Sequence, residues 1–260
     1  CFEDGNIIHV DGSVDPARDK GVIDMELQLK DLEAIDKRLD KAKKAARTGD
    51  KEALKTVATI EKCKTHLEEG KSIRSLELDN DAKILVSEMQ LITEKPVLYV
   101  CNVDESSAVS GNNHTKAVEE LVKDEDCEVM YLCAGMESDI SELETFEEKQ
   151  MFLEELGLEE PGVNYLIKKA YKLLDLETYF TAGVKEVRAW TINAGMKAPQ
   201  AAGVIHTDFE KGFIRAEVIK YSDFVELGSE AACREKGKLN VEGKDYVVQD
   251  GDVMHFRFNV

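Results

Sequence analysis

Apolar residues recur with helical spacing over the first quarter of the chain. Two runs show intervals of three and four residues, and the segment Thr48-Gly49-Asp50 separates them. Gly49 is expected to end the first helix, and Asp50 is expected to cap the second. The sequence therefore predicts an antiparallel helical hairpin whose first helix covers residues 21–47. The repeating positions are Leu32, Ile35, Leu39, Ala42 and Ala46, then Ala53, Val57, Ile60, Lys64 and Leu67.

The middle of the chain alternates short apolar runs with helical segments. Residues 97–101 form an apolar run that ends on Asn102, which is typical of a buried parallel strand. A second apolar run, 127–133, ends at Ala134-Gly135. This alternation predicts a βαβα unit in which both strand ends meet at one edge of a sheet. The predicted helices run from Asn80 or Asp81 to about Ile92, from a cap at Thr115 to about Val122, through the acidic segment after Glu137, and from Val163 to Leu174.

The last third of the chain changes character, because apolar and polar residues alternate there with a period of two. This period predicts half-buried strands. Asp250-Gly251-Asp252 predicts a tight turn into the last strand, and a short helix is expected over 228–235. The region has no grouped Ser, His and Asp and no metal-ligand spacing, so we expect a compact α+β binding module over 176–260. The predicted strands cover residues 187–192, 213–219 and 253–258.

The amino end predicts a short strand from Asn6 to Val10, a turn at Asp11-Gly12-Ser13 and a helix breaker at Pro16. The chain opens on Cys1, within what already looks like a strand. We therefore expect the chain to be a fragment with further residues upstream.

Charge is unevenly distributed along the 260 residues. The formal net charge is −19, which opposes non-specific nucleic-acid binding by the whole chain. From residue 37 to residue 64, however, ten Lys or Arg face four acids, which is about +6. A phosphate-rich partner is one interpretation of this basic cluster, and a solvated helical face is the other. The candidate contact residues are Lys37, Arg38, Lys41, Lys43, Lys44, Arg47 and Lys51.

Six cysteines are scattered without a C-x-x-C motif. Those at 101, 127 and 133 lie in apolar runs and are expected to be small core residues rather than ligands or disulfide partners. This usage favours a reducing compartment, the cytoplasm. No apolar run reaches the length of a membrane span, so no membrane partner is expected.

Asn102 and Glu105 follow the first predicted strand of the middle region, where open α/β sheets bind ligands. The flat amide of Asn102 offers a donor and an acceptor, which suits the edge of a purine. Asn-x-x-Asp at such a strand end is the guanine-reading motif of GTPases. Here the last position is Glu105, one methylene longer, which weakens the case for guanine.

Taken together, several segments resemble the YchF/Obg-like ATPases, and the resemblance covers essentially the whole chain. The carboxyl-terminal segments are long and specific, whereas the loop segments are only moderately so. The segments that carry the resemblance are residues 102–105, 133–137, 178–183, 187–192, 198–209 and 250–256, together with the helical hairpin.

The resemblance implies three domains. Residues 1–20 and 84–175 would be the remainder of a Ras-like P-loop nucleotide domain, and residues 21–83 would be an inserted α-helical arm. Residues 176–260 would be a TGS domain, which is an α+β module of the β-grasp type. The implied fold class is thus a partial α/β sheet with an inserted hairpin and a carboxyl-terminal β-grasp module.

The resemblance also implies an Mg²⁺-dependent, ribosome-associated ATPase that prefers ATP to GTP. In such a protein Asn102 would contact the purine edge, and Val103 would lie against the base through its backbone. Glu105 would stand where the guanine-specific acid stands in GTPases. The second base-side loop would contain Ala134, Gly135 and Met136.

The sequence departs from that family pattern in one large respect: it contains no G-x-x-x-x-G-K-S/T motif. The phosphate-binding loop and the Mg²⁺ ligands are therefore expected upstream, and the 260 residues alone are predicted not to hydrolyse ATP. The alternative function is a non-catalytic module that binds the ribosome or ribosomal RNA through the basic arm and the TGS domain.

Four other residues have weaker cases for chemistry. His206 and His255 are expected to be structural, and Trp190 is expected to belong to the core rather than to a stacking platform. Cys101 precedes Asn102 and could make ligand binding sensitive to oxidation, unless burial makes its thiol inert.

Overall fold

The structure is a computed structural model that describes residues 1–5, 9, 12–183 and 186–259. The predicted strand from Asn6 to Val10 lies largely outside these described residues. The chain divides into two compact units, residues 1–169 and 170–260. The predicted division into three domains stays a prediction.

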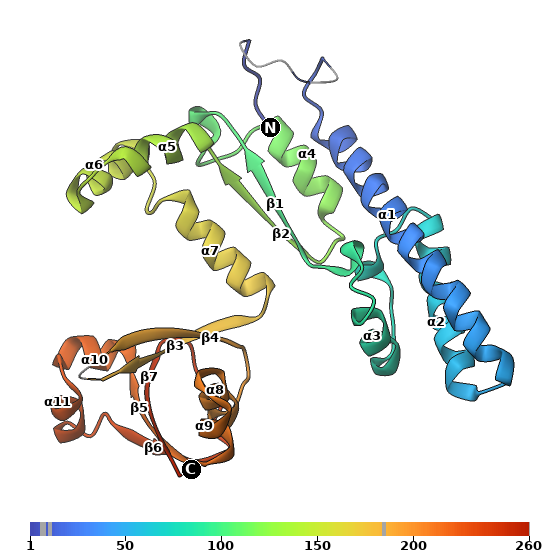
Figure 1. The fold of residues 1–260 in the computed structure, drawn as a ribbon. Helices are drawn as coiled ribbons and strands as arrows, with labels where there is room; N and C mark the ends of the chain where they lie inside the picture. Colours follow the sequence, from blue (N-terminus) through green and yellow to red (C-terminus); the bar gives the residue numbers. More distant parts are fainter. Residues whose placement is uncertain (6–8, 10–11, 184–185, 260) are drawn as a thin grey trace. The chain divides into compact units, whose positions relative to one another are not determined.

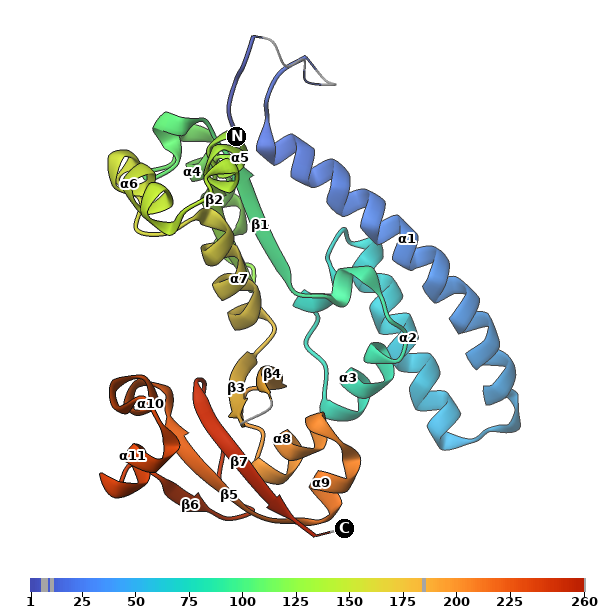
Figure 2. The ribbon, with the colours of Figure 1, turned by 60° about the vertical axis from the view of Figure 1, so that its left-hand side comes forward.

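The first unit begins with two long helices that lie side by side (Figure 1, Figure 2). Gly49 ends the connection between them at φ +77°, and the Asp50 side chain accepts a hydrogen bond from the Ala53 N–H at 3.0 Å. Both features confirm the predicted turn. The first helix starts earlier than predicted, because Asp15 caps it and Pro16 occupies its first turn, where proline is tolerated. The two helices are α1 (Pro16–Ala45) and α2 (Lys51–Glu68).

The helix predicted from residue 80 to about Ile92 is shorter in the structure. Helix α3 spans Asn80–Ser87, and a separate 3₁₀ turn covers Ile92–Glu94. The N–H groups of Ile92 and Thr93 donate to the carboxylate of Asp31 on α1, at 2.9 and 2.7 Å. Gln90 has a positive φ of 54°, which breaks the helical path, and the N–H groups of Ile92 and Thr93 are bound to Asp31 rather than within a helix. The prediction was therefore wrong at this end.

Asp31 is the buried link between α1 and the segment that leads into the first strand. Its side chain is 2% exposed and accepts a third hydrogen bond from the Thr93 hydroxyl at 2.7 Å. The same hydroxyl oxygen accepts from the Ile73 N–H at 3.2 Å. Around these polar contacts lies an apolar cluster that α1, α2 and the following turns share. Its buried members are Ile35, Leu39, Ile60, Cys63, Leu67, Ile73, Val86, Met89 and Leu91.

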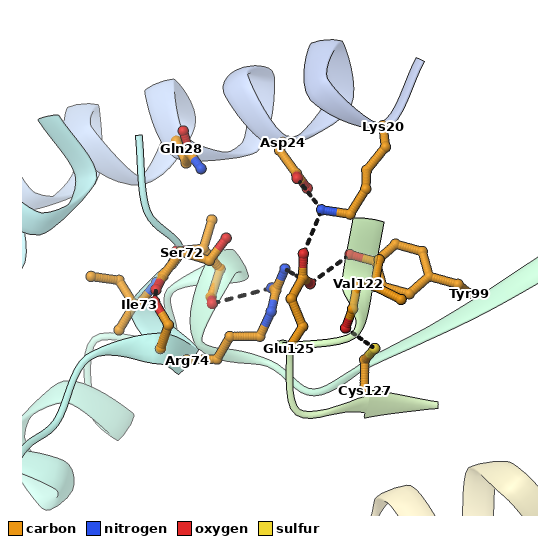
Figure 3. A network of polar contacts seen from close by, with 12 residues as sticks. Lys20, Asp24, Gln28, Ser72, Ile73, Arg74, Tyr99, Val122, Glu125 and Cys127 are labelled. Atoms are coloured by element: carbon orange, nitrogen blue, oxygen red, sulfur yellow. Dashed lines mark hydrogen bonds and ion pairs between the residues drawn. The ribbon is translucent and has the colours of Figure 1, made fainter. Parts of the chain in front are cut away.

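A second polar cluster joins the start of α1 to the sheet (Figure 3). Lys20 pairs with Asp24 at 2.6 Å and with Glu125 at 2.7 Å, and Glu125 also accepts from the Tyr99 hydroxyl at 3.0 Å. Arg74 lies 3.8 Å from Oε2 of Glu125, the oxygen that also accepts from Tyr99, whereas Lys20 pairs with Oε1. Burial alone would favour the neutral amine, but the two carboxylates raise the pKa of Lys20 above its ordinary value. The lysine is therefore held as a cation.

Two parallel strands form the sheet of the first unit, β1 (Val97–Asn102) and β2 (Cys127–Leu132), and Asn102 lies opposite Leu132. The predicted second strand included Cys133, which instead lies at the start of a helix. The predicted cap at Thr115 was also wrong, because Asn112 caps that helix and Thr115 completes a capping box. The helices around this sheet are α4 (Asn113–Val122), α5 (Ala134–Glu142), α6 (Phe146–Leu156) and α7 (Gly162–Leu173).

The second unit is built on a five-stranded sheet with the order β4-β3-β7-β5-β6. β3 and β7 are parallel, and the other pairs are antiparallel. This order places the last strand, β7, in the middle of the sheet. One face carries a cluster around Tyr179 and Phe256, and the other carries a smaller cluster around Ile219 and Cys233. The strands are β3 (Leu176–Ala182), β4 (Val187–Asn193), β5 (Phe213–Lys220), β6 (Asn240–Glu242) and β7 (Asp252–Phe258).

The predicted strands β4, β5 and β7 are confirmed, but the predicted helix over 228–235 is not a single helix. Gly228 ends α10 at φ +74°, and Ser229 caps a new helix, α11. Trp190 packs against the core as predicted, and its indole N–H donates to Thr181. The helices of this unit are α8 (Ala198–Ile205), α9 (Thr207–Lys211), α10 (Tyr221–Leu227) and α11 (Glu230–Glu235).

In the part of the chain that the structure describes, no helix combines the length and the apolar character needed to cross a membrane.

The first testable prediction concerns Asp31. Replacing it in Asp31→Ala leaves three buried donors without their acceptor, so the free energy of unfolding should fall by about 3 kcal/mol. Urea denaturation measures this loss. The matched control is Glu33→Ala, since Glu33 lies on the same helix and makes only an exposed ion pair with Lys30. The control should change stability by less than about 0.5 kcal/mol. Equal stability of the two variants would show that Asp31 does not hold α1 in place.

Candidate functional site

Asn102 lies at the carboxyl end of β1 with its side chain exposed. The Ala134 N–H, at the start of α5, donates to its Oδ1 at 3.0 Å. This bond joins the first loop (residues 102–105) to the second loop (residues 133–137), as expected for the ends of two neighbouring parallel strands. The structure therefore brings together the two segments that the sequence placed at one sheet edge.

The bond to Ala134 decides what the Asn102 amide can offer. Its Oδ1 is occupied, whereas its Nδ2 donates to no described residue. A free amide donor fits N7 of a purine, which is an acceptor in adenine and guanine alike. The geometry therefore suits purine recognition without distinguishing the two bases.

Val103 contributes only backbone to the surface. Its side chain is 2% exposed and packs in the cluster that contains Cys101 and Val118. Its N–H donates to the Leu132 carbonyl at 2.9 Å, which extends the pairing of the strands by one residue. Cys101 is also buried, at 3% exposed, and burial raises the pKa of its thiol. The sequence allowed either an oxidation-sensitive thiol or a buried, inert one directly before Asn102. Burial makes the Cys101 thiol the inert one.

The two carboxylates of the first loop have different surroundings. Asp104 accepts from the Ser106 hydroxyl at 2.6 Å and the Ser107 N–H at 3.0 Å, and these bonds lower its pKa. The side chain of Glu105 is exposed and makes no hydrogen bond or ion pair with any described residue. Only Glu105 is therefore available to a ligand. The capping role of Asp104 was missed, although Asp followed by Ser at the third position is a known signal for it.

The second loop presents backbone N–H groups. Cys133 precedes α5 without a side-chain cap, so the first N–H groups of the helix keep their donors free, apart from the one bound to Asn102. Ala134 and Gly135 are exposed, but Met136 is only 3% exposed and points its side chain into the fold. Met136 can therefore face a ligand through its backbone alone.

A pocket of about 470 Å³ lies behind the second loop. It is lined by residues of β2, α5 and α7, including Met130, Met136 and Tyr165, and Asn102 does not line it. The pocket is therefore not formed by the exposed amide of Asn102.

The basic residues of the arm fall into two groups. Arg38 donates to the carbonyls of Glu88 and Met89 at 3.2 and 3.4 Å, and Lys43 pairs with Glu61 at 2.8 Å. The remaining candidates, Lys37, Lys41, Lys44, Arg47 and Lys51, are exposed and pair with no described residue. Lys44, Arg47 and Lys51 flank the turn between α1 and α2, and we call these three residues the arm tip.

The site around Asn102 does not supply a set of ligands for Mg²⁺. Asp104 is satisfied by its own loop, which leaves Glu105 as the single free carboxylate there. Elsewhere among the described residues, Glu217, Glu230 and His255 place ligand atoms within 4.8 Å of one another. Arg257 and Arg234 already pair with these two glutamates at 3.0 and 2.9 Å, so guanidinium groups neutralise the cluster. His206 caps α9 through its ring Nδ1, which accepts from the Asp208 N–H.

Comparison with known proteins places these features in a family. Residues 176–259 match the family named YchF-GTPase_C, which is described as "Protein of unknown function (DUF933)". The chain is 51% identical over 262 residues to the "Ribosome-binding ATPase YchF" of Bacillus subtilis. The match spans the whole chain and 71% of that protein. It is 50% identical to the protein of the same name from Escherichia coli O157:H7, again with 71% of that protein covered.

More distant relatives agree. The chain is 45% identical to "Obg-like ATPase 1" of Gallus gallus and covers 66% of it. The structure of the Schizosaccharomyces pombe YchF GTPase matches with a TM-score of 0.84 and 35% identity, over 98% of this chain and 70% of that one. An identity near one half over the full 260 residues shows that the chain belongs to the YchF/Obg-like ATPase family.

Proposed function

We propose that these 260 residues form the base-reading and ribosome-contacting part of a ribosome-associated ATPase. The observation that carries this proposal is the bond between Asn102 and Ala134, which builds one donor-rich surface from two loops. Relatives named "Ribosome-binding ATPase YchF" support the kind of function. Asn102 contacts the purine edge, and the second loop contacts the same base through the backbone of Ala134, Gly135 and Met136.

ATP is the preferred nucleotide in this proposal, and GTP binds more weakly. Guanine-reading sites use a carboxylate that accepts from N1–H and N2–H₂ of the base, and adenine lacks both donors. Glu105 is one methylene longer than the aspartate of such sites and is held by no described neighbour. A carboxylate that is not fixed against the base adds little for guanine and does not exclude adenine.

Hydrolysis needs groups that this part does not contribute. The sequence contains no G-x-x-x-x-G-K-S/T motif, and the residues around Asn102 offer no ligand set for Mg²⁺. We therefore assign phosphate and Mg²⁺ binding to the remaining 29% or so of the length of the relatives, and expect the 260 residues alone to be inactive.

The ribosome, or ribosomal RNA, is the proposed partner of the arm tip and of the second unit. The arm tip presents Lys44, Arg47 and Lys51, whose side chains pair with no described acid, which suits a phosphate backbone. The second unit would dock as a TGS module of the β-grasp type, since its mixed five-stranded sheet carries helices on both faces. A ribosomal partner places the protein in the cytoplasm.

The base-reading assignment is tested by Asn102→Ala in the full-length ATPase that contains these residues. The variant loses a hydrogen bond to the base and the link to Ala134, so the Kd for ATP should rise roughly 10-fold. Calorimetric titration with ATP and Mg²⁺ measures it. Ser110→Ala is the control, because Ser110 is exposed and lies outside both loops and the proposed contacts. An unchanged ATP affinity in Asn102→Ala would refute the assignment.

The role of Glu105 is tested by shortening it. Glu105→Asp restores the carboxylate position of guanine-reading sites, so the preference for ATP over GTP should fall by roughly 10-fold or more. Competition of GTP against ATP, measured on the full-length ATPase, gives the ratio directly. A ratio that stays at the wild-type value would mean that the length of this side chain does not set the preference.

The arm tip is tested by reversing its charges. Lys44→Glu, Arg47→Glu and Lys51→Glu together should abolish co-sedimentation with ribosomes, because the tip would repel phosphate. The control reverses three exposed lysines outside the arm, Lys95, Lys116 and Lys123, and should sediment with ribosomes as the wild type does. Binding by the arm-tip variant that is as strong, and as insensitive to added salt, as that of the control would contradict the proposal.

A further inference from the structure

Glu137, which the sequence did not select, joins the second loop to the amino end of α7. It lies in the first turn of α5, directly after Met136. Its Oε1 accepts from the Gly162 N–H at 2.7 Å and its Oε2 accepts from the Val163 N–H at 3.2 Å. The first N–H groups of a helix have no partner within that helix, so Glu137 supplies acceptors to α7 from another element.

Packing alone does not hold the second loop at this point. The pocket of about 470 Å³ lies behind it, and both Met136 and Glu137 line that pocket. Side chains that border a pocket have fewer contacting atoms on that side, so dispersion fixes them less firmly than a filled core would. The two bonds of Glu137 are directional, and they limit how far the start of α5 can move.

Gly162 shows how closely α7 approaches the site. A Cβ at this position would lie 2.3 Å from Cδ1 of Leu132 and 2.8 Å from Oε1 of Glu137, so nothing larger than glycine fits without displacement. Leu132 is the direct partner of Asn102 across the two strands. The amino end of α7 therefore touches both the strand end beside Asn102 and the residue that follows the second loop.

A second contact keeps α7 in place along β2. Lys169 pairs with Glu128 at 2.8 Å, and both side chains are largely buried. The helix thus meets the strand at two points, Gly162 against Leu132 and Lys169 against Glu128. Because α7 is fixed on β2 in this way, its bonds to Glu137 hold the second loop in a defined position relative to β2. β2 is the strand whose Leu132 pairs with Asn102.

We propose that Glu137 is a positioning residue for purine recognition, and this inference rests on the proposed function of the site. It touches no nucleotide. It holds the backbone of Ala134 to Met136 at the separation from Asn102 at which both loops contact one base. The consequence is specific: losing Glu137 weakens binding of the base and leaves binding of the phosphates unchanged.

The experiment compares Glu137→Ala and Glu137→Gln in the full-length ATPase. The Kd values are measured for ATP, for GTP and for inorganic tripolyphosphate, which carries phosphates without a base. Glu137→Ala should weaken ATP roughly 10-fold, and Glu137→Gln should weaken it less because one acceptor oxygen remains. Tripolyphosphate should bind as it does to the wild type.

The matched control is Glu142→Ala. Glu142 ends the same helix, and its exposed side chain bonds to no described residue, so the loss of this side chain should leave every Kd unchanged. Gly162→Ala is the second variant, and serves if Glu137→Ala does not fold. It displaces α7 from Leu132 and Glu137, so it should weaken ATP and spare tripolyphosphate.

Three results would overturn the inference. A lower melting temperature with an unchanged Kd for ATP would make Glu137 merely structural. An equal loss for ATP and tripolyphosphate would place its effect away from the base. ATP binding that is weakened in Asn102→Ala but not in Glu137→Ala would reject this inference alone, whereas unchanged binding in Asn102→Ala would reject the proposed function itself.

Discussion

The hydrogen bond from the Ala134 N–H to Oδ1 of Asn102 sets the chemistry of the whole site. Parallel pairing brings the ends of β1 and β2 side by side, but the two loops beyond them would otherwise move independently. The bond joins them and occupies one of the two lone pairs of the Asn102 Oδ1. The Asn102 amide N–H₂ and the N–H groups at the start of α5 remain as donors, and Glu105 remains as a carboxylate acceptor. In the proposed function these donors meet the ring acceptors of a purine.

Buried polar contacts, rather than apolar packing alone, fix α1 against the rest of the first unit. Lys20, held by Asp24 on the same helix, pairs with Glu125 beside the sheet, and Asp31 in the middle of α1 binds the segment before β1. The buried face of the second half, around Ile35 and Leu39, is apolar. Apolar surfaces can slide against each other at little cost, whereas a buried carboxylate with three donors tolerates one position only. The start of the arm is therefore fixed in register relative to β1.

The sequence predicted those elements whose pattern is local. The turn at Gly49 and Asp50, the strand before Asn102 and the alternating strands β4, β5 and β7 all follow from neighbouring residues. The errors have two origins. The caps at Asn112 and Ser229 are local signals that were not recognised. The segment after α3 is not α-helical at Ile92 and Thr93, because Asp31, more than 60 residues away, takes their N–H groups.

The candidate site shows the same limit of sequence analysis. Asn102 and the second loop were predicted from their places at strand ends, and the structure brings them together. Glu137 was not selected, because one carboxylate in an acidic segment looks solvated until its partners 25 and 26 residues later are known. Arg38 and Lys43 looked equivalent to their basic neighbours in the sequence. In the structure, Arg38 donates to a backbone carbonyl and Lys43 pairs with Glu61. Spacing along one helix cannot reveal which cations a second segment has neutralised.

The geometry of the arm also reconciles a basic contact surface with an acidic chain. Helix α1 has 30 residues, so it extends about 45 Å. Electrostatic interactions between exposed charges fade over about 8 Å at physiological salt. Charges of the first unit that lie farther than this from the arm tip are therefore screened there, and Lys44, Arg47 and Lys51 contribute directly to the local potential. In the proposed function the arm tip can thus attract phosphate although the chain as a whole is acidic.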